Sequence, residues 1–437
     1  MRKSFLVVVI GLLVMLMIGS MAGSVAAQDG DPLVIGLMVD QSGPLTIYGF
    51  EEEYGFKLGL LYATGIDPAD YDSIDDALAA VTIAGRPVSV VMRDNASAPD
   101  TASSQARELV EQEGAEILVG SPSSGVMTGV QQVALDSDVI LFVDPAASPA
   151  ITGANFNVNT FRVCRNSFQD FLAFAPYATE NIGQDFVILA IDTDFGTASA
   201  AAAQGVLGSA GINFVGDPIY APADTTNFTP YLQSVLNSGA DAVLPIWAGD
   251  SSVTLFQQMD ELGVGDQMVV VSAFNSNDIV ALSDPSNIGN TSWIVYQYAF
   301  PDNEINDWLV EQYKAVYNDV PDLFSECSFA TAQALVAGVE ATGGDTLPES
   351  MIPELEGLIF QGPKGTYGIR PSDHQTLVLM YIAQLDNLDD PDQKFYTLLA
   401  EVPASQIIPP VLLPEAMASR TEMDADFMTE FEAMDME

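Results

Sequence analysis

The stretch LVIGLMVDQSGPLTIYG, residues 33–49, carries the pattern that decides the fold. Residues 33–40 are apolar at nearly every position, which predicts a strand that is buried on both faces. The polar turn QSGP at 41–44 follows, and residues 48–64 then predict a helix. A buried strand followed by a helix is typical of a parallel sheet that helices cover on both sides.

The same strand–helix unit recurs along the chain in two sets. The sets are separated near residues 161–167, which predicts two doubly wound α/β lobes. We expect strands at 33–40, 88–94, 116–120, 139–144, 186–193, 213–220, 242–247, 268–274, 293–300 and 377–385. We expect helices at 48–64, 101–112, after Ser124, and at 197–209, 229–237, 251–262, 305–317 and 328–341. After residue 386 the pattern fades into an acidic tail that contains prolines.

Composition limits the classes of protein that fit this chain. Of its 437 residues 48% are hydrophobic, which excludes a disordered chain and favours more than one domain. The chain has 60 acidic and 13 basic residues and a formal charge of −47. Because the acids are spread along the whole chain, we interpret them as a halophilic surface suited to concentrated salt, which screens charge repulsion. Such a surface repels nucleic acid and anionic lipid, so neither is an expected partner.

The N-terminus has the features of a secretory signal peptide over residues 1–27. Arg2 and Lys3 precede an apolar run at 5–18, and small residues lead to a Val-Ala-Ala site at 25–27. The run is short for a membrane span, although an uncleaved anchor is the alternative. No cysteine follows the signal to accept a lipid. We therefore expect export to the periplasm or the cell exterior.

Signatures of catalysis are weak, and we expect no enzyme, no cofactor and no bound metal. The single histidine, His374, lies between polar residues and is expected in a turn. The stretch GSPSSG at 120–125 fails the nucleophile-elbow pattern because Ser121 stands where that pattern has glycine. Phosphate loops, dinucleotide fingerprints and His/Cys clusters are missing from the sequence. Carboxylate pairs are too frequent in so acidic a chain to single one out.

Small polar turns follow three strands of the first set, at 41–44, 120–125 and 144–149. Ligands of open α/β sheets bind beyond the carboxyl ends of the strands. A helix that starts at Ser123 or Ser124 would offer backbone N–H groups and hydroxyls to an anion such as a carboxylate, although ordinary N-capping is the alternative. Three such turns at one sheet edge favour a binding site.

Several motifs in a fixed order resemble the branched-chain amino-acid-binding (Leu/Ile/Val-binding-like) proteins of ABC importers. These motifs are residues 33–49, EILVGSPSSG at 116–125, PAASPAITG at 145–153, Phe-Arg at 161–162, DTDFG at 192–196, DTTNFTPY at 224–231 and QGPKGTYGIRPSDHQ at 361–375. The resemblance implies the type I periplasmic-binding fold, in which three hinge crossings join two lobes around a ligand cleft. We place the crossings near 162–166, 298–301 and 362–367.

The resemblance also assigns the lobes. Residues 32–163 and 299–364 are expected to form lobe 1, and residues 164–298 and 365–385 to form lobe 2. Residues 386–437 are expected to form an acidic C-terminal extension.

The resemblance first implies residues that bind the end of the solute that bears a carboxylate. Tyr48 matches a cleft tyrosine of the first lobe, and Ser124 matches the serine that holds a ligand carboxylate. Ala146 and Ser148 match a turn that contacts the backbone of a bound amino acid.

The opposite wall is expected to be aromatic. Phe195 stands where the family often has tyrosine, Trp247 falls near a second-lobe aromatic, and Phe274 follows the strand expected at 268–274. We expect these rings to contact the apolar part of the solute.

One departure from the family concerns the ligand's ammonium group. The family supplies an acidic residue after the strand expected at 268–274, but residues 273–275 here read Ala-Phe-Asn. A buried ammonium without a partner is costly. Either another acid substitutes, such as Asp192, Asp194 or Asp250, or the solute is not an α-amino acid.

The resemblance implies an extracytoplasmic solute-binding component that delivers a small amino-acid-like, carboxylate or amide solute to an ABC permease, and we expect a monomer. A ligand-sensing module and a secreted hydrolase are the alternatives. Cys164 and Cys327 are the only cysteines. Export permits a disulfide between them, and two buried thiols are the alternative.

Overall fold

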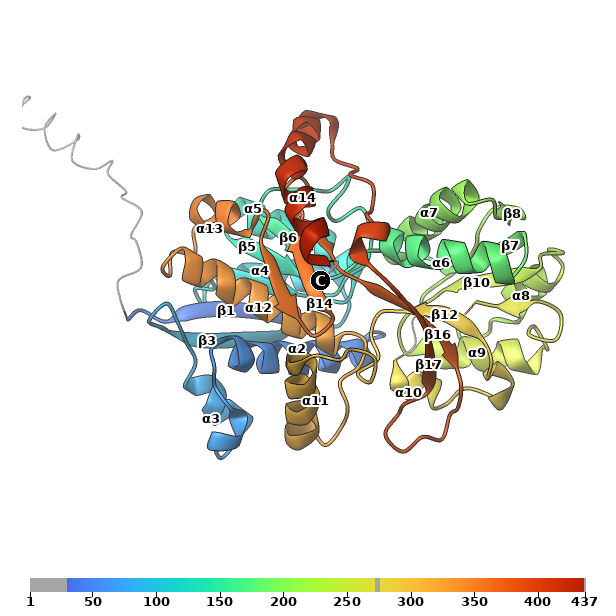
Figure 1. The fold of residues 1–437 in the computed structure, drawn as a ribbon, viewed down its shortest axis with the longest axis horizontal. Helices are drawn as coiled ribbons and strands as arrows, with labels where there is room; N and C mark the ends of the chain where they lie inside the picture. Colours follow the sequence, from blue (N-terminus) through green and yellow to red (C-terminus); the bar gives the residue numbers. More distant parts are fainter. Residues whose placement is uncertain (1–29, 272–275, 436–437) are drawn as a thin grey trace, which may run out of the picture.

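The computed structural model describes residues 30–271 and 276–435. Two α/β lobes lie side by side, and segments distant in the sequence contribute to each (Figure 1). Each lobe contains a parallel sheet with a separate apolar cluster on either face. The strand predicted at residues 33–40 is observed as β1 (Leu33–Val39), and the predicted fold class is confirmed.

Lobe 1 contains a six-stranded sheet in the order β2-β3-β1-β4-β5-β6, in which only β2 runs antiparallel to its neighbour. Its strands are β1 (Leu33–Val39), β2 (Thr82–Ile83), β3 (Arg86–Asp94), β4 (Ile117–Gly120), β5 (Ile140–Val143) and β6 (Thr160–Arg162). Its helices are α2 (Thr46–Ala63), η1 (Pro68–Asp70), α3 (Ile74–Ala79), α4 (Pro99–Glu111), α5 (Ser124–Asp136), α11 (Glu304–Tyr317), α12 (Ser325–Ala341) and α13 (Pro348–Leu355). A hairpin of β13 (Ile359–Gly362) and β14 (Gly365–Ile369) continues into β15 (Thr376–Leu377).

Lobe 2 contains a parallel sheet in the order β11-β10-β7-β8, with β9 also paired to β7. Its strands are β7 (Asp185–Ile191), β8 (Asn213–Phe214), β9 (Ile219–Ala221), β10 (Ala242–Ile246) and β11 (Val269–Val270). Its helices are α6 (Ser167–Asn181), α7 (Asp194–Ser209), α8 (Thr229–Leu236), α9 (Ser251–Glu261), α10 (Asn277–Val280) and η2 (Pro285–Asn287). A second, antiparallel sheet pairs β12 (Thr291–Ile294), β16 (Met380–Leu385) and β17 (Tyr396–Val402).

The lobes are joined where the sequence predicted two of the three crossings. The first crossing links β6 to α6, as expected for 162–166, and the second leads from β12 to α11 through 298–301. The third lies later than expected, because residues 362–367 form the β13–β14 hairpin and the chain enters a lobe 2 sheet only at β16. The hairpin stays with lobe 1 because Tyr367 and Ile369 are buried in the core of that lobe.

Residues 386–435 pack on both lobes rather than trailing from one. β17 extends the antiparallel sheet of lobe 2, and η3 (Ala404–Gln406), η4 (Glu415–Met423) and α14 (Asp424–Asp435) then lie over the hairpin of lobe 1 (Figure 1). Phe427 and Phe431 of α14 pack with Leu377. The Arg420 guanidinium lies 2.6 Å from the Glu356 carboxylate, which also lies 3.0 Å from the buried His374 ring. The expected acidic extension thus forms a further connection between the lobes.

Local sequence explains why key elements begin where they do. Gly49 lies against the backbone of Asp40, where a β-carbon would overlap the Asp40 carbonyl, so a glycine lets α2 start beside the end of β1. Asn166 and Gln169 form a capping box at the start of α6. Thr193 caps α7 by accepting a hydrogen bond from the Gly196 amide.

Some predicted elements differ from the observed ones. The strand expected at 213–220 is two short strands, β8 and β9, that both pair with β7. The strand expected at 293–300 ends at Ile294 in β12. No helix was predicted where α6 lies, and this helix contains Pro176.

The predicted signal peptide at residues 1–27 lies outside the described residues. Within residues 30–271 and 276–435, no helix combines the length and the apolar character that a membrane span requires.

Candidate functional site

A cavity of about 640 Å³ lies between the two lobes. Lobe 1 lines it with the loop before α2, the start of α4, the start of α5 and the turn after β5, and lobe 2 lines it with the start of α7 and the loops after β9 and β10. The first crossing contributes Arg165. Its volume suits a small organic solute, and most of its lining is apolar.

The start of α5 faces this cavity with Ser123, Ser124 and Gly125. Ser123 caps the helix through a 3.4 Å hydrogen bond from the Val126 amide. Ser124 Oγ accepts a 3.2 Å hydrogen bond from the Ser148 amide, so its hydroxyl hydrogen can be donated elsewhere. The positive end of the helix and this hydroxyl together can bind an anion.

The turn after β5 lines the cavity through different residues from those predicted. Pro145 and Ala147 lie on the wall, whereas Ala146 and Ser148 do not. The carbonyl oxygens of Ala146 and Ser148 instead accept hydrogen bonds from Arg162 Nη1, at 3.2 and 2.7 Å. Ser148 therefore contributes to the wall indirectly, through the hydrogen bond that its backbone N–H donates to Ser124 Oγ.

Tyr48, Phe324 and Arg165 form the inner end of the cavity. The rings of Tyr48 and Phe324 meet edge to face, with centroids 4.8 Å apart. Arg165 is 2% exposed and its Cζ lies 5.7 Å from the Phe324 ring centroid. Its Nε lies 3.3 Å from Asp170 Oδ1. Burial lowers the pKa of Arg165 and raises the pKa of Asp170 to about 6.

Of the two predicted aromatics that the structure describes, one lies on the lobe 2 wall. Phe195 lines the cavity beside Thr193 and Asp194 at the start of α7. Trp247 does not line it, since the indole is buried in the core of lobe 2 against Phe228 and its Nε1 donates to Ser251 Oγ at 2.9 Å. Phe274 lies outside the described residues.

The acids that line the cavity are Asp100 and Asp194, and both are exposed. Asp250, predicted as a substitute partner for an ammonium, is exposed and does not line the cavity. Its backbone amide donates to the Pro44 carbonyl of the other lobe at 2.9 Å. Asp194 is thus the one predicted acid that the described structure places on the wall.

Sequence reasoning did not identify Arg165 or Phe324 as site residues. Arg165 had a usable signal, because it lies in the first crossing of a chain with only 13 basic residues. Phe324 had none, because a phenylalanine before a helix is far more often a core residue.

Cys164 and Cys327 lie together at the hinge, with Cα atoms 5.6 Å apart. This separation is typical of a disulfide, which stays a prediction. Asp144 is the third group in the only set of three potential metal-ligating side chains that come together among the described residues. If the predicted disulfide forms, its two sulfur atoms offer no thiolate to a metal.

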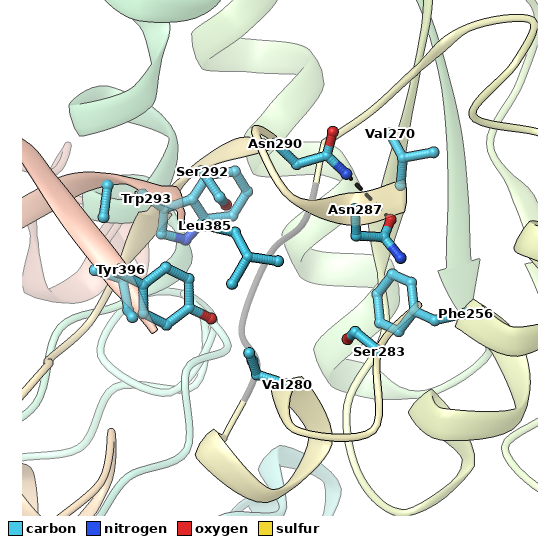
Figure 2. Close-up of a pocket in the computed structure, with 12 residues that line it drawn as sticks. Phe256, Val270, Val280, Ser283, Asn287, Asn290, Ser292, Trp293, Leu385 and Tyr396 are labelled. Atoms are coloured by element: carbon cyan, nitrogen blue, oxygen red, sulfur yellow. Dashed lines mark hydrogen bonds between the residues drawn. The ribbon is translucent and has the colours of Figure 1, made fainter. Parts of the chain in front are cut away.

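A second cavity in lobe 2 is too small for a solute. It measures about 40 Å³ and lies where β12, β16 and β17 approach α9 and β11, with Tyr396 and Trp293 on one side and Phe256 on the other (Figure 2). Such a volume holds one or two water molecules.

Comparison with known proteins agrees with this geometry. A Leu/Ile/Val-binding protein homologue of Brucella suis is 24% identical over 313 residues, which cover 69% of this chain and 78% of the relative. The crystal structure of an ABC-type branched-chain amino acid transporter protein from Rhodopseudomonas palustris is 29% identical, with a TM-score of 0.70 and coverage of 88% of this chain and 100% of that one. A solute-binding protein from R. palustris in complex with benzoate is 21% identical, with a TM-score of 0.74 and coverage of 88% and 98%.

The model of the periplasmic binding protein family matches residues 32–392. That span includes both lobes, the crossings and every described residue that lines the cavity between the lobes. The chain therefore belongs to the periplasmic binding protein family and resembles the branched-chain amino-acid-binding proteins of ABC transporters in sequence and fold.

Proposed function

We propose that this protein captures a small solute bearing a carboxylate in the cavity between its lobes and delivers it to an ABC permease in the membrane. The observation that carries the proposal is the cavity itself, because both lobes and a crossing line it and the N-terminus of α5 faces into it. A site shared between two lobes lets solute binding control their relative orientation.

Hydrogen bonds between the lobes support a mechanism of closure. The Gly249 amide of lobe 2 donates to the Tyr48 hydroxyl of lobe 1 at 3.2 Å. The Asn277 amide donates to the Asp322 carboxylate at 2.6 Å. Opening of the cleft would break these bonds, and a solute that contacts both lobes would favour the closed arrangement by its differential affinity.

The relatives suggest which part of the solute is held in common. The proteins named above are described as binding Leu/Ile/Val or benzoate. All of these molecules have a carboxylate on an apolar body. Ser124 with the start of α5 fits the carboxylate, and Phe195 with the apolar wall fits the body.

The proposal also covers the export of the protein and its oligomeric state. The predicted signal at residues 1–27 would direct the chain out of the cytoplasm, and binding without turnover requires neither a cofactor nor a metal. We propose that the protein works as a monomer that contacts the permease with both lobes. N-terminal sequencing of the secreted protein should find Gln28 as its first residue.

Small-angle X-ray scattering with and without solute tests closure. Native mass spectrometry of protein purified without denaturation identifies a retained solute, which is then removed by unfolding and refolding. Restoring that solute should decrease the radius of gyration, while an unrelated neutral sugar serves as the control. An unchanged radius at saturation would contradict capture by closure.

A further inference from the structure

Buried basic residues gather at the hinge of this strongly acidic protein. Arg162, Arg165, Lys364 and Arg370 are four of the 13 basic residues in the chain, and each is at most 3% exposed. Burying a cation is costly unless nearby groups compensate for its lost hydration. Their concentration at one place therefore requires a specific set of partners.

Three of these cations have a carboxylate partner. Arg370 lies 2.7 Å from Asp373, Arg165 lies 3.3 Å from Asp170, and Lys364 lies 3.6 Å from Glu326.

Arg162 differs, because the acceptors of its hydrogen bonds are neutral. They are the Gln375 side chain, the Thr152 hydroxyl, and the carbonyls of Ala146 and Ser148. The four cations and their three carboxylates therefore leave one excess positive charge at the hinge, where Arg165 reaches the cavity.

The environment of the inner end of the cavity is positive for two further reasons. The α5 N-terminus lines the cavity, where its free amides add partial positive charge. Arg162 also donates to the carbonyls of Ala146 and Ser148, two residues of the turn after β5 that do not line the cavity. The buried acids near this end include Glu51, Glu52, Asp144 and Asp322, and burial raises the pKa of each, which disfavours their charged forms.

The described residues that line the cavity offer no buried carboxylate to an ammonium group. Among the described residues that line the cavity, the carboxylates are Asp100 and Asp194, and both are exposed to solvent. Residues 272–275 have the sequence Ser-Ala-Phe-Asn and so add no acid. An ammonium carried to the inner end would meet Arg165 instead of a partner.

We propose that the solute is an apolar carboxylate without a free amine, and that Arg165 selects it by binding the carboxylate at the inner end of the cavity. The inference rests on the proposed function and narrows its substrate class. The Arg165 guanidinium would hold the charged end together with Ser124 and the start of α5, and Phe195 would contact the apolar body.

Matched probes test this class by titration calorimetry on the full mature chain. The probes are 4-methylpentanoate, its primary amide and leucine, with benzoate and benzamide as an aromatic pair. A hydrogen bond to a charged group changes affinity by about 10- to 150-fold. Each acid should therefore bind at least ~10-fold more tightly than its amide, and 4-methylpentanoate should bind more tightly than leucine.

Arg165→Gln should weaken binding of the acids by about 10- to 150-fold and leave the amides nearly unchanged. Because this change leaves Asp170 buried without its cation, Arg165→Gln combined with Asp170→Asn keeps the site neutral and serves as the variant that folds. Arg165→Lys should restore part of the preference for acids. Arg86→Gln is the matched control, since Arg86 is a buried arginine paired with Glu116 on the far side of lobe 1.

The outcomes separate the inference from the function it rests on. If leucine binds as tightly as 4-methylpentanoate, or if the neutral double variant binds acids as tightly as the parent, the inference is wrong and the proposed function stands. If an amide binds as tightly as its matched acid, the inference and the carboxylate of the proposed function are both wrong, and only capture of a solute in the cavity stands. If no probe binds the parent and none changes its radius of gyration, both are rejected.

Discussion

Replacement of Lys364 by methionine tests whether the hinge depends on its buried ion pair. The Lys364 and Glu326 side chains are each 2% exposed and their charged atoms lie 3.6 Å apart. Lys364 also donates to the Val295 carbonyl at 3.1 Å, and the Tyr367 hydroxyl donates to Glu326. Methionine has a similar length and fills the same space, so the change removes the charge with little change in packing.

The expected loss follows from the carboxylate that remains. Removing one partner of a buried ion pair costs about 3–5 kcal/mol, because the other charge stays buried without compensation. Tyr367 still donates to Glu326, so we expect the lower end, about 3 kcal/mol at pH 8. Burial already raises the pKa of Glu326, and protonation neutralises the carboxyl, so the loss should shrink as the pH falls toward 5.

Urea unfolding followed by tryptophan fluorescence measures this difference at each pH. The double variant Glu326→Gln/Lys364→Met removes both charges and should recover most of the lost stability. Arg93→Met is the surface control, because Arg93 forms a partly exposed pair with Glu113 and should cost less than about 1 kcal/mol. A loss below about 1 kcal/mol at pH 8, or a double variant no more stable than the single one, would refute the argument.

Four further predictions concern charge, covalent structure and binding. Burial raises the pKa of Asp322 from 3.8 to about 7, so the folded chain keeps a proton that the unfolded chain releases. The parent should therefore lose stability relative to Asp322→Asn as the pH rises from 4 to 7. Thermal melts of the two proteins whose melting temperatures change equally over this range would contradict the prediction. The melting temperature should rise from low to molar potassium chloride, because salt screens the repulsion among the carboxylates of a chain with 60 acids and 13 basic residues. Equal melting temperatures at the two salt concentrations would exclude a halophilic surface. Denatured protein should take up no alkyl group at Cys164 and Cys327 without reductant, and a mass increase of two groups would disprove the disulfide. Ser124→Ala should weaken binding of the retained solute by about 10-fold in calorimetry, and unchanged affinity would move the carboxylate away from α5.

Strands β1, β4 and β5 of the first lobe could be predicted from the sequence because they are buried on both faces. Every residue of β4 and β5 is buried, and both strands appear in the sequence as short unbroken apolar runs. Strand β17 gave no such signal, because most of its residues are partly or fully exposed. Only its pairing with β16 makes that segment a strand, and such pairing over a sequence distance cannot be seen in a local pattern.

The candidate site was predicted in outline and corrected in detail. The turns after β1, β4 and β5 converge on one cavity, because the carboxyl ends of parallel strands lie at the same sheet edge. Ala146, Ser148 and Trp247 belong to the expected segments, yet their side chains do not line the cavity. Each is next in sequence to a residue that lines the cavity: Pro145 and Ala147 flank Ala146, Ala147 precedes Ser148, and Ala248 follows Trp247.

The sequence by itself determined that this chain forms two α/β lobes and that polar turns lie at one sheet edge of the first lobe. The reason is that the order of apolar and polar residues follows the periodicity with which strands and helices are buried. Only the tertiary structure decided which neighbour in each turn faces the solute. It also placed Arg165 from the crossing, Tyr48 from α2 and Phe324 from the start of α12 at one end of one cavity. The physical reason is that the direction of a side chain depends on the backbone dihedrals of its turn and on contacts with segments far away in the chain, and neither is encoded by the residue type alone.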